Sequence, residues 1–257
     1  MKITVGGVAF DNLTLPEAVK TAMRGGDEAI RIHTPNALML EACAQHPPYA
    51  DLLNSASLVL ADGAGVLAAA KKQGTPLRQR IAGIDFGEAI LQEAARTGDR
   101  VFLLGGADGV APLAAQNMKK KHPSLQICGT YWGFFEKDGD ENRRVIGMIR
   151  ACRPDILLVC FGFPIQEHWM RDNLPSLPSV RLAVGLGGSL DVWAGKVRRA
   201  PLLLQRLGLE WLWRMASQPR RLRQIPDLLR FAMRRRGGRK VADLRSRGQS
   251  RAKKVVG

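Results

Sequence analysis

The segment PDILLVCFGFPIQEHW (residues 154–169) contains a continuous apolar run, DILLVCFG, that ends in Gly162. An apolar run without alternation is typical of a strand that is buried on both faces of a parallel sheet. Five further runs have the same form: AIRIHT (29–34), SLVLAD (57–62), RVFLLGG (100–106), LQICGTY (125–131) and RLAVGLGG (181–188). The sequence therefore predicts six buried parallel strands.

The segments between these runs carry apolar residues at helical spacing and stop at Gly or Pro, as in PEAVKTAMRGG and GEAILQEAARTG. Strands that alternate with helices predict an α/β fold with a doubly wound, mostly parallel, Rossmann-like sheet. The first residues, MKITVGGVAF, predict one additional strand. We expect an α/β domain in residues 1–195, a C-terminal amphipathic helical appendage in 196–236 and a disordered basic tail in 237–257.

The net charge of +16 is concentrated at the C-terminal end of the chain. Residues 1–195 hold 20 Lys+Arg and 20 Asp+Glu, whereas residues 196–257 hold 19 and 3. Nucleic acid, an anionic bilayer and an anionic small substrate all attract such a segment. Charge alone does not decide among these partners.

The basic segment also carries aromatic and aliphatic side chains. In RLGLEWLWRMASQPRRLRQIPDLLRFAMRRR, Leu, Trp and Phe alternate with Arg, a composition typical of a helix that lies on an anionic membrane. The alternative is a helix that packs on the core through its Leu and Trp face. No apolar run approaches the roughly 20 residues that span a bilayer, so peripheral attachment is the most that we expect.

The N-terminus and the cysteines indicate the compartment. The first residues lack the apolar stretch and the cleavage site of a secretory signal, so we expect a cytoplasmic protein. The four cysteines stand singly in apolar segments, without CxxC spacing. This pattern favours packing residues over a disulfide framework or a zinc site.

Polar residues gather where the predicted strands end, which is the ligand-binding edge of a doubly wound sheet. Asp62 follows one strand, at a place where its carboxylate could act as a general base toward a substrate hydroxyl. The alternative is an Asp that caps the helix beginning near Val66. Thr34 and Asn36 offer a hydroxyl and an amide that suit sugar hydroxyls or N-acetyl groups, with a plain turn as the alternative.

Two glycine-rich turns follow predicted strands, LGGADGVA (104–111) and VGLGGSLD (184–191). Glycines let backbone N–H groups and a helix N-terminus approach a phosphate, and Asp191 could accept a hydrogen bond from a ribose or a base. The turns lack the GxGxxG register of a dinucleotide fold, and each taken alone is also compatible with a simple tight turn. Two such turns at one sheet edge favour a nucleotide.

Metal ligands are scarce. Asp138 and Asp140 in KDGDEN form a DxD pair, but the charged, turn-forming residues around them predict a solvent loop. His33 and His168 have no partner at ligand spacing. We therefore expect neither a metal nor another cofactor.

Taken in order, these motifs make the chain similar to the WecG/TagA/CpsF glycosyltransferases over about residues 3–225, with an N-acetylmannosaminyltransferase-like character. The matching pieces are TPN (34–36), ADGAGV (61–66), RIAGID (80–85), LLGGADGVA (103–111), PDILLVCFGFPIQEHW (154–169) and GLGGSLDVWAGKVRRAP followed by GLEWLWRM (185–215). The resemblance implies an inverting, metal-independent enzyme of cell-envelope or exopolysaccharide biosynthesis. Such an enzyme moves an N-acetylmannosamine-type sugar or a related hexose from UDP to a sugar on undecaprenyl diphosphate.

The resemblance also implies residue roles. Asp62 would be the base that deprotonates the acceptor hydroxyl. Other residues would line the same cleft: Thr34, Asn36, Arg80 and Gln166. The residues that would hold UDP lie in the two glycine-rich turns: Gly105, Gly106, Gly109, Gly187, Gly188 and Asp191. The appendage would close over the site at the membrane and bring three arginines to the diphosphate: Arg214, Arg220 and Arg223.

The expected partners are a UDP-sugar, a lipid-linked sugar diphosphate and the anionic inner face of the cell membrane, where the protein would be peripheral. The sequence leaves open whether the chain works as a monomer or a homo-oligomer. A nucleic-acid-binding protein is the alternative; it explains the charge but leaves the loops at the sheet edge without a role, so we expect no nucleic acid partner. A nucleotide-dependent oxidoreductase is disfavoured because the GxGxxG register is absent.

Overall fold

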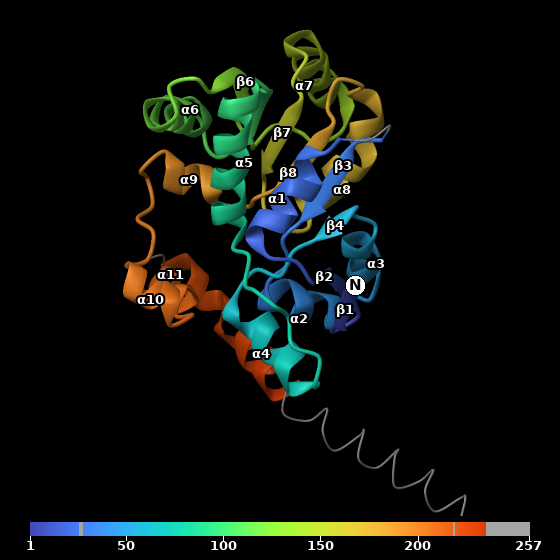
Figure 1. Ribbon diagram of the computed structural model, residues 1–257, viewed down its shortest axis with the longest axis vertical. Helices are drawn as coiled ribbons and strands as arrows, with labels where there is room; N and C mark the ends of the chain where they lie inside the picture. The colour runs from blue at the N-terminus through green and yellow to red at the C-terminus, as the bar shows by residue number, and fades with distance from the viewer. Residues whose placement is uncertain (26–27, 218, 235–257) are drawn as a thin grey trace, which may run out of the picture.

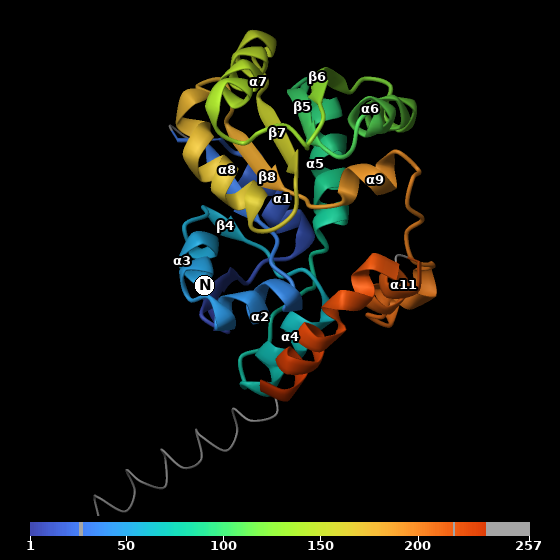
Figure 2. The same ribbon diagram turned by 180° about the vertical axis from the view of Figure 1, so that it is seen from behind.

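A parallel six-stranded sheet forms the centre of the computed structural model, which describes residues 1–25, 28–217 and 219–234 (Figures 1 and 2). The strand order is β4-β3-β8-β7-β5-β6, and every neighbouring pair is parallel. The strands are β3 (Ile30–His33), β4 (Leu58–Val59), β5 (Arg100–Gly105), β6 (Gln126–Tyr131), β7 (Ile156–Cys160) and β8 (Leu182–Gly185). Each strand lies within a predicted run, so the α/β fold is confirmed.

The N-terminal segment differs from the prediction of one strand, which is wrong. Residues Lys2–Val5 (β1) and Val8–Asp11 (β2) form an antiparallel hairpin. Gly6 and Gly7 make the turn with φ of +57° and +83°. Two-residue hairpin turns that match the strand twist often need positive φ at both central residues, which glycine adopts without strain.

Helices cover both faces of the sheet. One face packs on α1 (Leu15–Met23), α5 (Gly83–Thr97), α6 (Val110–Lys121) and α9 (Ser189–Trp193). The other face packs on α7 (Gly139–Cys152) and α8 (Ile165–Asn173), which the short 3-10 turn η1 (Leu174–Ser176) follows. The hairpin packs with α2 (Ala37–Gln45), α3 (Pro48–Asn54) and α4 (Ala64–Lys72) near β4.

Strand β7 shows why the apolar runs are unbroken. Ile156 and Leu158 belong to the core beneath α5, whereas Leu157 and Val159 belong to the core beneath α7 and α8. All four side chains are fully buried. Successive strand residues point to opposite faces, so a sheet that is covered on both sides requires an apolar residue at every position.

The C-terminal segment is helical, as predicted. It consists of α10 (Leu202–Arg206), α11 (Glu210–Ser217), the 3-10 turn η2 (Pro219–Gln224) and a helix over residues 225–234. The last helix lies beside α4 in both views (Figures 1 and 2). There, a Cβ built on Gly65 would be 3.5 Å from the Phe231 ring, and Arg234 pairs at 3.2 Å with the buried Glu41 of α2.

Within residues 1–25, 28–217 and 219–234, no helix combines the length and the apolar character that a bilayer span requires. The tail predicted for 237–257 lies outside the described residues.

Close backbone packing at the end of β5 gives a test of the fold. A Cβ on Gly105 would be 2.4 Å from the backbone oxygen of Cys160, and φ is +140°. We expect Gly105→Ala to lower the free energy of unfolding by about 2–5 kcal/mol in urea titrations. Gly147 is the control, because it lies exposed within α7 and a Cβ added there would meet no atom within 4 Å. Gly147→Ala should stabilise the protein by roughly 0.5–1 kcal/mol, and equal effects at both positions would contradict the packing argument.

Candidate functional site

A cavity of about 560 Å³ lies between the loops that follow β3 and β4 and the C-terminal helices. The wall from the α/β domain includes Asn36, Ala37, Leu38, Asp62, Gly63, Ala64, Gly65, Arg80, Ala82 and Ile84. The opposite wall includes Gly208, Glu210, Trp211, Leu212, Arg214, Met215, Arg221, Gln224, Ile225, Leu228, Leu229, Phe231 and Ala232. The cavity is therefore complete only when the C-terminal segment is docked.

Asp62 lines this cavity directly after β4. Its Oδ2 accepts a hydrogen bond of 3.3 Å from the backbone N–H of Gly83. The N-cap of α4 is Gly63, and no side chain caps this helix, so the alternative that Asp62 is a helix cap is wrong. Burial raises the pKa of the Asp62 carboxyl to about 6, although Arg214 and the Gly83 N–H act to lower it. A carboxylate with a pKa near neutrality is suited to accept a proton from a hydroxyl.

Thr34 is held beside Asp62 by the sheet. Its hydroxyl donates a hydrogen bond of 3.1 Å to the backbone oxygen of Gly185 in β8. A Cβ built on Gly83 would be 2.9 Å from Thr34 Oγ1 and 3.7 Å from Asp62 Oδ2. The structure thus brings together the ends of β3, β4 and β8 and the start of α5.

Asn36 combines a structural role with a place in the cavity wall. It is the N-cap of α2, where its Oδ1 accepts hydrogen bonds from the N–H groups of Leu38 (3.0 Å) and Met39 (3.2 Å). The sequence left a plain turn as the alternative for Asn36, whereas in the structure Asn36 caps a helix. Because the oxygen is committed to the helix, the amide nitrogen is the atom that Asn36 can offer to a ligand.

Gln166 is buried and its amide is bonded to the protein. Its Oε1 accepts hydrogen bonds from the backbone N–H of Gly162 (3.2 Å) and of Gly187 (3.0 Å), and its Nε2 donates to Glu167 Oε1 (2.9 Å). The side chain therefore joins the turn after β7 to the turn after β8. This geometry gives Gln166 a role in positioning the Gly187 loop.

Two of the predicted arginines line the cavity with Asp62. Arg80 precedes α5, whereas Arg214 comes from α11. Their guanidinium groups lie 3.8 Å and 3.4 Å from the carboxylate of Glu210. The positive charges of both arginines act to lower the pKa of Asp62, so cations from two distant parts of the chain act on the same carboxylate.

The glycines after β5 have different surroundings. At Gly106 a Cβ would be 2.8 Å from the side chain of Val110, so this glycine, like Gly105, permits close packing within the protein. Gly109 is the N-cap of α6 with φ of +73°, and a Cβ there would meet nothing within 4 Å. Of the three, Gly109 is the glycine that faces open space.

The glycine turn after β8 meets the C-terminal segment. Gly187 has φ of +52°, and a Cβ added there would lie in open space. At Gly188 a Cβ would be 3.7 Å from Asp191 Oδ2 and 3.9 Å from Arg221 Nη2. Burial raises the pKa of Asp191, and the charge of Arg221 acts against this rise. Arg221 therefore connects the cavity wall to the predicted nucleotide turn.

The family model of the WecG/TagA/CpsF glycosyl transferases matches residues 3–241. The chain belongs to this glycosyltransferase family. A curated relative from Bacillus spizizenii is 36% identical over 187 residues, which are 73% of this chain and 71% of the relative. A relative from Staphylococcus aureus strain MW2 is 31% identical over 231 residues, 88% of this chain and 89% of the relative. Both are named N-acetylglucosaminyldiphosphoundecaprenol N-acetyl-beta-D-mannosaminyltransferase.

Sequence reasoning missed two charged residues in the cavity of this glycosyltransferase. Glu210 and Arg221 both line it, although neither was predicted as a site residue. Arg221 stands in the run PRRLR, and nothing in that pattern tells which arginine faces inward. Arg223, which was predicted, is exposed and does not line the cavity. The side chain of Arg220 lies outside the described residues.

The DxD pair of the glycosyltransferase lies at the surface. Asp138 is the N-cap residue of α7, and Asp140 in the first turn pairs with the exposed Arg143. Across the described ranges, no three His, Cys, Asp or Glu side chains are grouped as a metal site would require. His33 is buried with its Nδ1 3.2 Å from the backbone oxygen of Leu53, and burial lowers its pKa to about 4.

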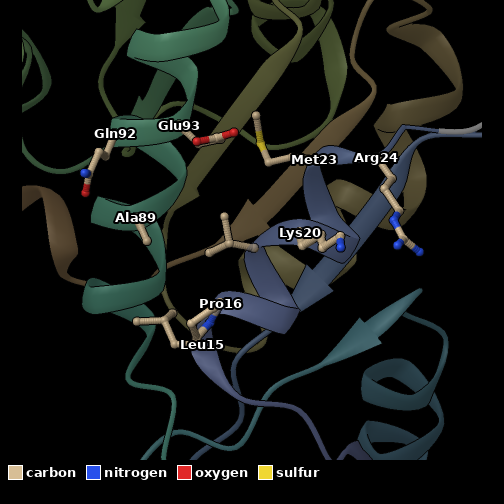
Figure 3. Close-up of a pocket in the computed structure, with 9 residues that line it drawn as sticks. Leu15, Pro16, Lys20, Met23, Arg24, Ala89, Gln92 and Glu93 are labelled. Atoms are coloured by element: carbon tan, nitrogen blue, oxygen red, sulfur yellow. The ribbon is translucent and has the colours of Figure 1, made fainter.

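A second hollow of about 490 Å³ lies between α1 and α5. Figure 3 shows its lining, with Pro16 and Met23 from one helix and Ala89 and Gln92 from the other. It contains none of the predicted site residues. The cavity around Asp62 is therefore the candidate active site of the glycosyltransferase.

Because the charge of Asp62 is buried, we expect the ionised residue to lower the free energy of unfolding of the protein. Its pKa rises from 3.8 to about 6 on folding, so the cost grows between these pH values and is complete above about 6. The shift corresponds to about 3 kcal/mol. We expect Asp62→Asn to raise the free energy of unfolding by up to that amount at pH 8, with little difference below pH 4. Urea titrations at both pH values measure this; a less stable variant at pH 8 would contradict it.

Proposed function

We propose that this glycosyltransferase moves an N-acetylmannosamine-type sugar or a related hexose from a UDP-sugar to a sugar on undecaprenyl diphosphate. The observation that carries the proposal is the Asp62 carboxylate, which shares one cavity with guanidinium groups from the α/β domain and the C-terminal segment. The names of the two curated relatives support the choice of the transferred sugar and of the acceptor. In this proposal residues 1–195 form the catalytic domain and 196–236 the closing appendage.

The reaction that fits this cavity is a direct displacement with inversion. Asp62 accepts the proton of the acceptor hydroxyl while the hydroxyl oxygen attacks the anomeric carbon of the donor. The bond between that carbon and the diphosphate oxygen breaks, and UDP leaves with the bonding electrons. The hydroxyl of Thr34 and the amide nitrogen of Asn36 lie beside Asp62. In this proposal they bind the sugar.

Arginines supply the charge that the departing UDP requires in this proposal. Arg80, Arg214 and Arg221 line the cavity, and preorganised cations stabilise negative charge that grows in the transition state. We infer that the enzyme needs no metal because these groups take that role. The turn at Gly188 with Asp191 lies next to Arg221, which supports this turn as a binding place for UDP.

The C-terminal segment supports attachment at the inner face of the cell membrane. Among the described residues, many of the large exposed apolar side chains lie here: Leu202, Leu203, Leu207, Trp211, Leu212, Leu222, Ile225, Leu229 and Met233. The same segment carries the basic surplus of the chain. Apolar and basic side chains together favour the surface of an anionic membrane, where a lipid-linked acceptor would be found.

Release of UDP from a panel of UDP-sugars tests the reaction. The panel includes UDP-N-acetylmannosamine and UDP-glucose, with a short-chain lipid diphosphate acceptor and EDTA present. We expect acceptor-dependent release of UDP, and we expect Asp62→Asn to lower its rate by about 10³-fold or more. The other carboxylate in the described cavity wall is Glu210, which pairs with arginines and so does not replace Asp62 as a base. The value of kcat/KM should fall below about pH 6, since protonated Asp62 cannot act as a base.

Other outcomes of this assay are equally informative. Full activity of Asp62→Asn would contradict the role of the base. Activity that returns only with magnesium or manganese would contradict metal independence and make Asp138 and Asp140 the first residues to mutate. No release of UDP under any of these conditions, together with tight RNA binding by the chain, would favour the nucleic-acid-binding alternative.

Arg221 and Arg223 form a matched pair for the diphosphate contact. We expect Arg221→Gln to lower kcat/KM for the UDP-sugar by about 10²-fold, because a cation is lost beside Gly188 and Asp191. Arg223→Gln should have a much smaller effect, since that side chain is exposed and outside the cavity wall. Initial rates at several donor concentrations measure both variants. The opposite order would mean that Arg223 reaches the diphosphate when substrate binds.

A further inference from the structure

Glu210 is a buried acidic residue in a segment that is otherwise strongly basic. Residues 196–234 contain two acidic side chains, Glu210 and Asp227. Glu210 is 8% exposed, at the first position of α11. Asp227 instead forms a pair with Arg230 in which both side chains are at least 40% exposed. Burying a carboxylate lowers the stability of the folded protein unless cations compensate its charge. The cations around Glu210 therefore indicate why an acidic residue stands at this buried position.

Three guanidinium groups surround the Glu210 carboxylate. Arg214 lies 3.4 Å from it, Arg199 3.6 Å and Arg80 3.8 Å. These distances are longer than the 2.7–2.9 Å that is usual for a charge-assisted hydrogen bond. Glu210 therefore draws the three cations together, and two of them, Arg80 and Arg214, line the cavity, where they can donate to an anionic ligand.

The same cluster spans the junction between the two walls of the cavity. Arg199 lies in the connection between α9 and α10, and its Nη1 donates a hydrogen bond of 2.6 Å to Asp85 in the first turn of α5. Arg80 belongs to the α/β domain, whereas Arg214 belongs to α11. Glu210 thus contacts a cation from the domain, one from the connection and one from its own helix.

We propose that Glu210 is a positioning residue that docks α11 on the α/β domain and gathers Arg80, Arg199 and Arg214 beside the Asp62 cavity. This inference rests on the proposed glycosyl transfer. It adds that Arg80 and Arg214, two of the arginines which serve the diphosphate, are held in place, before substrate binds, by a carboxylate of the protein. Glu210 itself lines the cavity, and the role assigned to it is to hold these cations, not to react with the substrate.

The charge of Glu210 also reaches the base. Asp62 is faced by Arg214 and Glu210 from α11, by Arg80 before α5 and by the backbone N–H of Gly83. Glu210 acts to raise the pKa of Asp62, and the two arginines act to lower it. Removal of the Glu210 charge therefore shifts this balance toward the ionised form of Asp62.

Glu210→Gln in the full-length chain tests the inference. We expect kcat to fall about 10²-fold, as for groups misplaced by about 1 Å. The acid limb of the kcat/KM profile should move to lower pH, which a merely structural role would not cause. Amide hydrogen exchange in residues 210–217 should increase. Asp227→Asn is the matched control, because it removes the other acidic charge of this segment, and it should leave all three readouts within twofold of wild type.

Glu210→Asp covers the case in which Glu210→Gln does not fold. It retains the charge with a shorter reach, so kcat should fall while the acid limb stays nearer its wild-type position. Wild-type kcat, acid limb and exchange in Glu210→Gln would overturn the inference, even if Asp62→Asn remained inactive. If Asp62→Asn were fully active, the proposed function would fail, while the exchange measurement would still decide whether Glu210 docks α11.

Discussion

The parallel pairing of β3 with both β4 and β8 determines where the candidate active site of this glycosyltransferase lies. Ile32 pairs with Leu58 on one side and with Val184 on the other, so the residues after these strands emerge together at one edge. Thr34, Asp62 and the Gly187 turn then become neighbours although they are far apart in sequence. A shift in this register would separate Asp62 from Thr34 and from the Gly187 turn, even if the rest of the fold were unchanged.

The two ends of the chain contribute different chemistry to the cavity. The sheet supplies the carboxylate and the glycine turns, while the C-terminal segment supplies cations and apolar side chains. Arg80 lies in the same part of the chain as Asp62, whereas Arg214 and Arg221 meet Asp62 only when the C-terminal segment is docked. The Glu41–Arg234 and Glu210–Arg80 pairs hold these elements together at two places, one at α2 and one just before α5.

The sequence predicted features that depend on local pattern. Unbroken apolar runs located all six strands, and a polar residue after a strand located Asp62 and Thr34. The N-terminal hairpin was missed because its two glycines were taken as part of one strand. The features that the sequence did not predict depend on tertiary packing. Gln166 accepts hydrogen bonds from two turns that are far apart in the sequence. Arg221 rather than Arg223 lines the cavity because of the geometry of the short turn η2.

Because one wall of the cavity comes from residues 208–232, the order in which a ribosome produces the chain has a catalytic consequence. The α/β domain is synthesised first and domains generally fold as units from the N-terminus, so Asp62 and Arg80 are in place before Arg214 and Arg221 join the cavity. A nascent chain that stops before residue 208 then lacks two of the three arginines that line the cavity, Arg214 and Arg221. Under the proposed function, a chain that lacks residues 208–232 has no closed cavity and does not consume activated sugar.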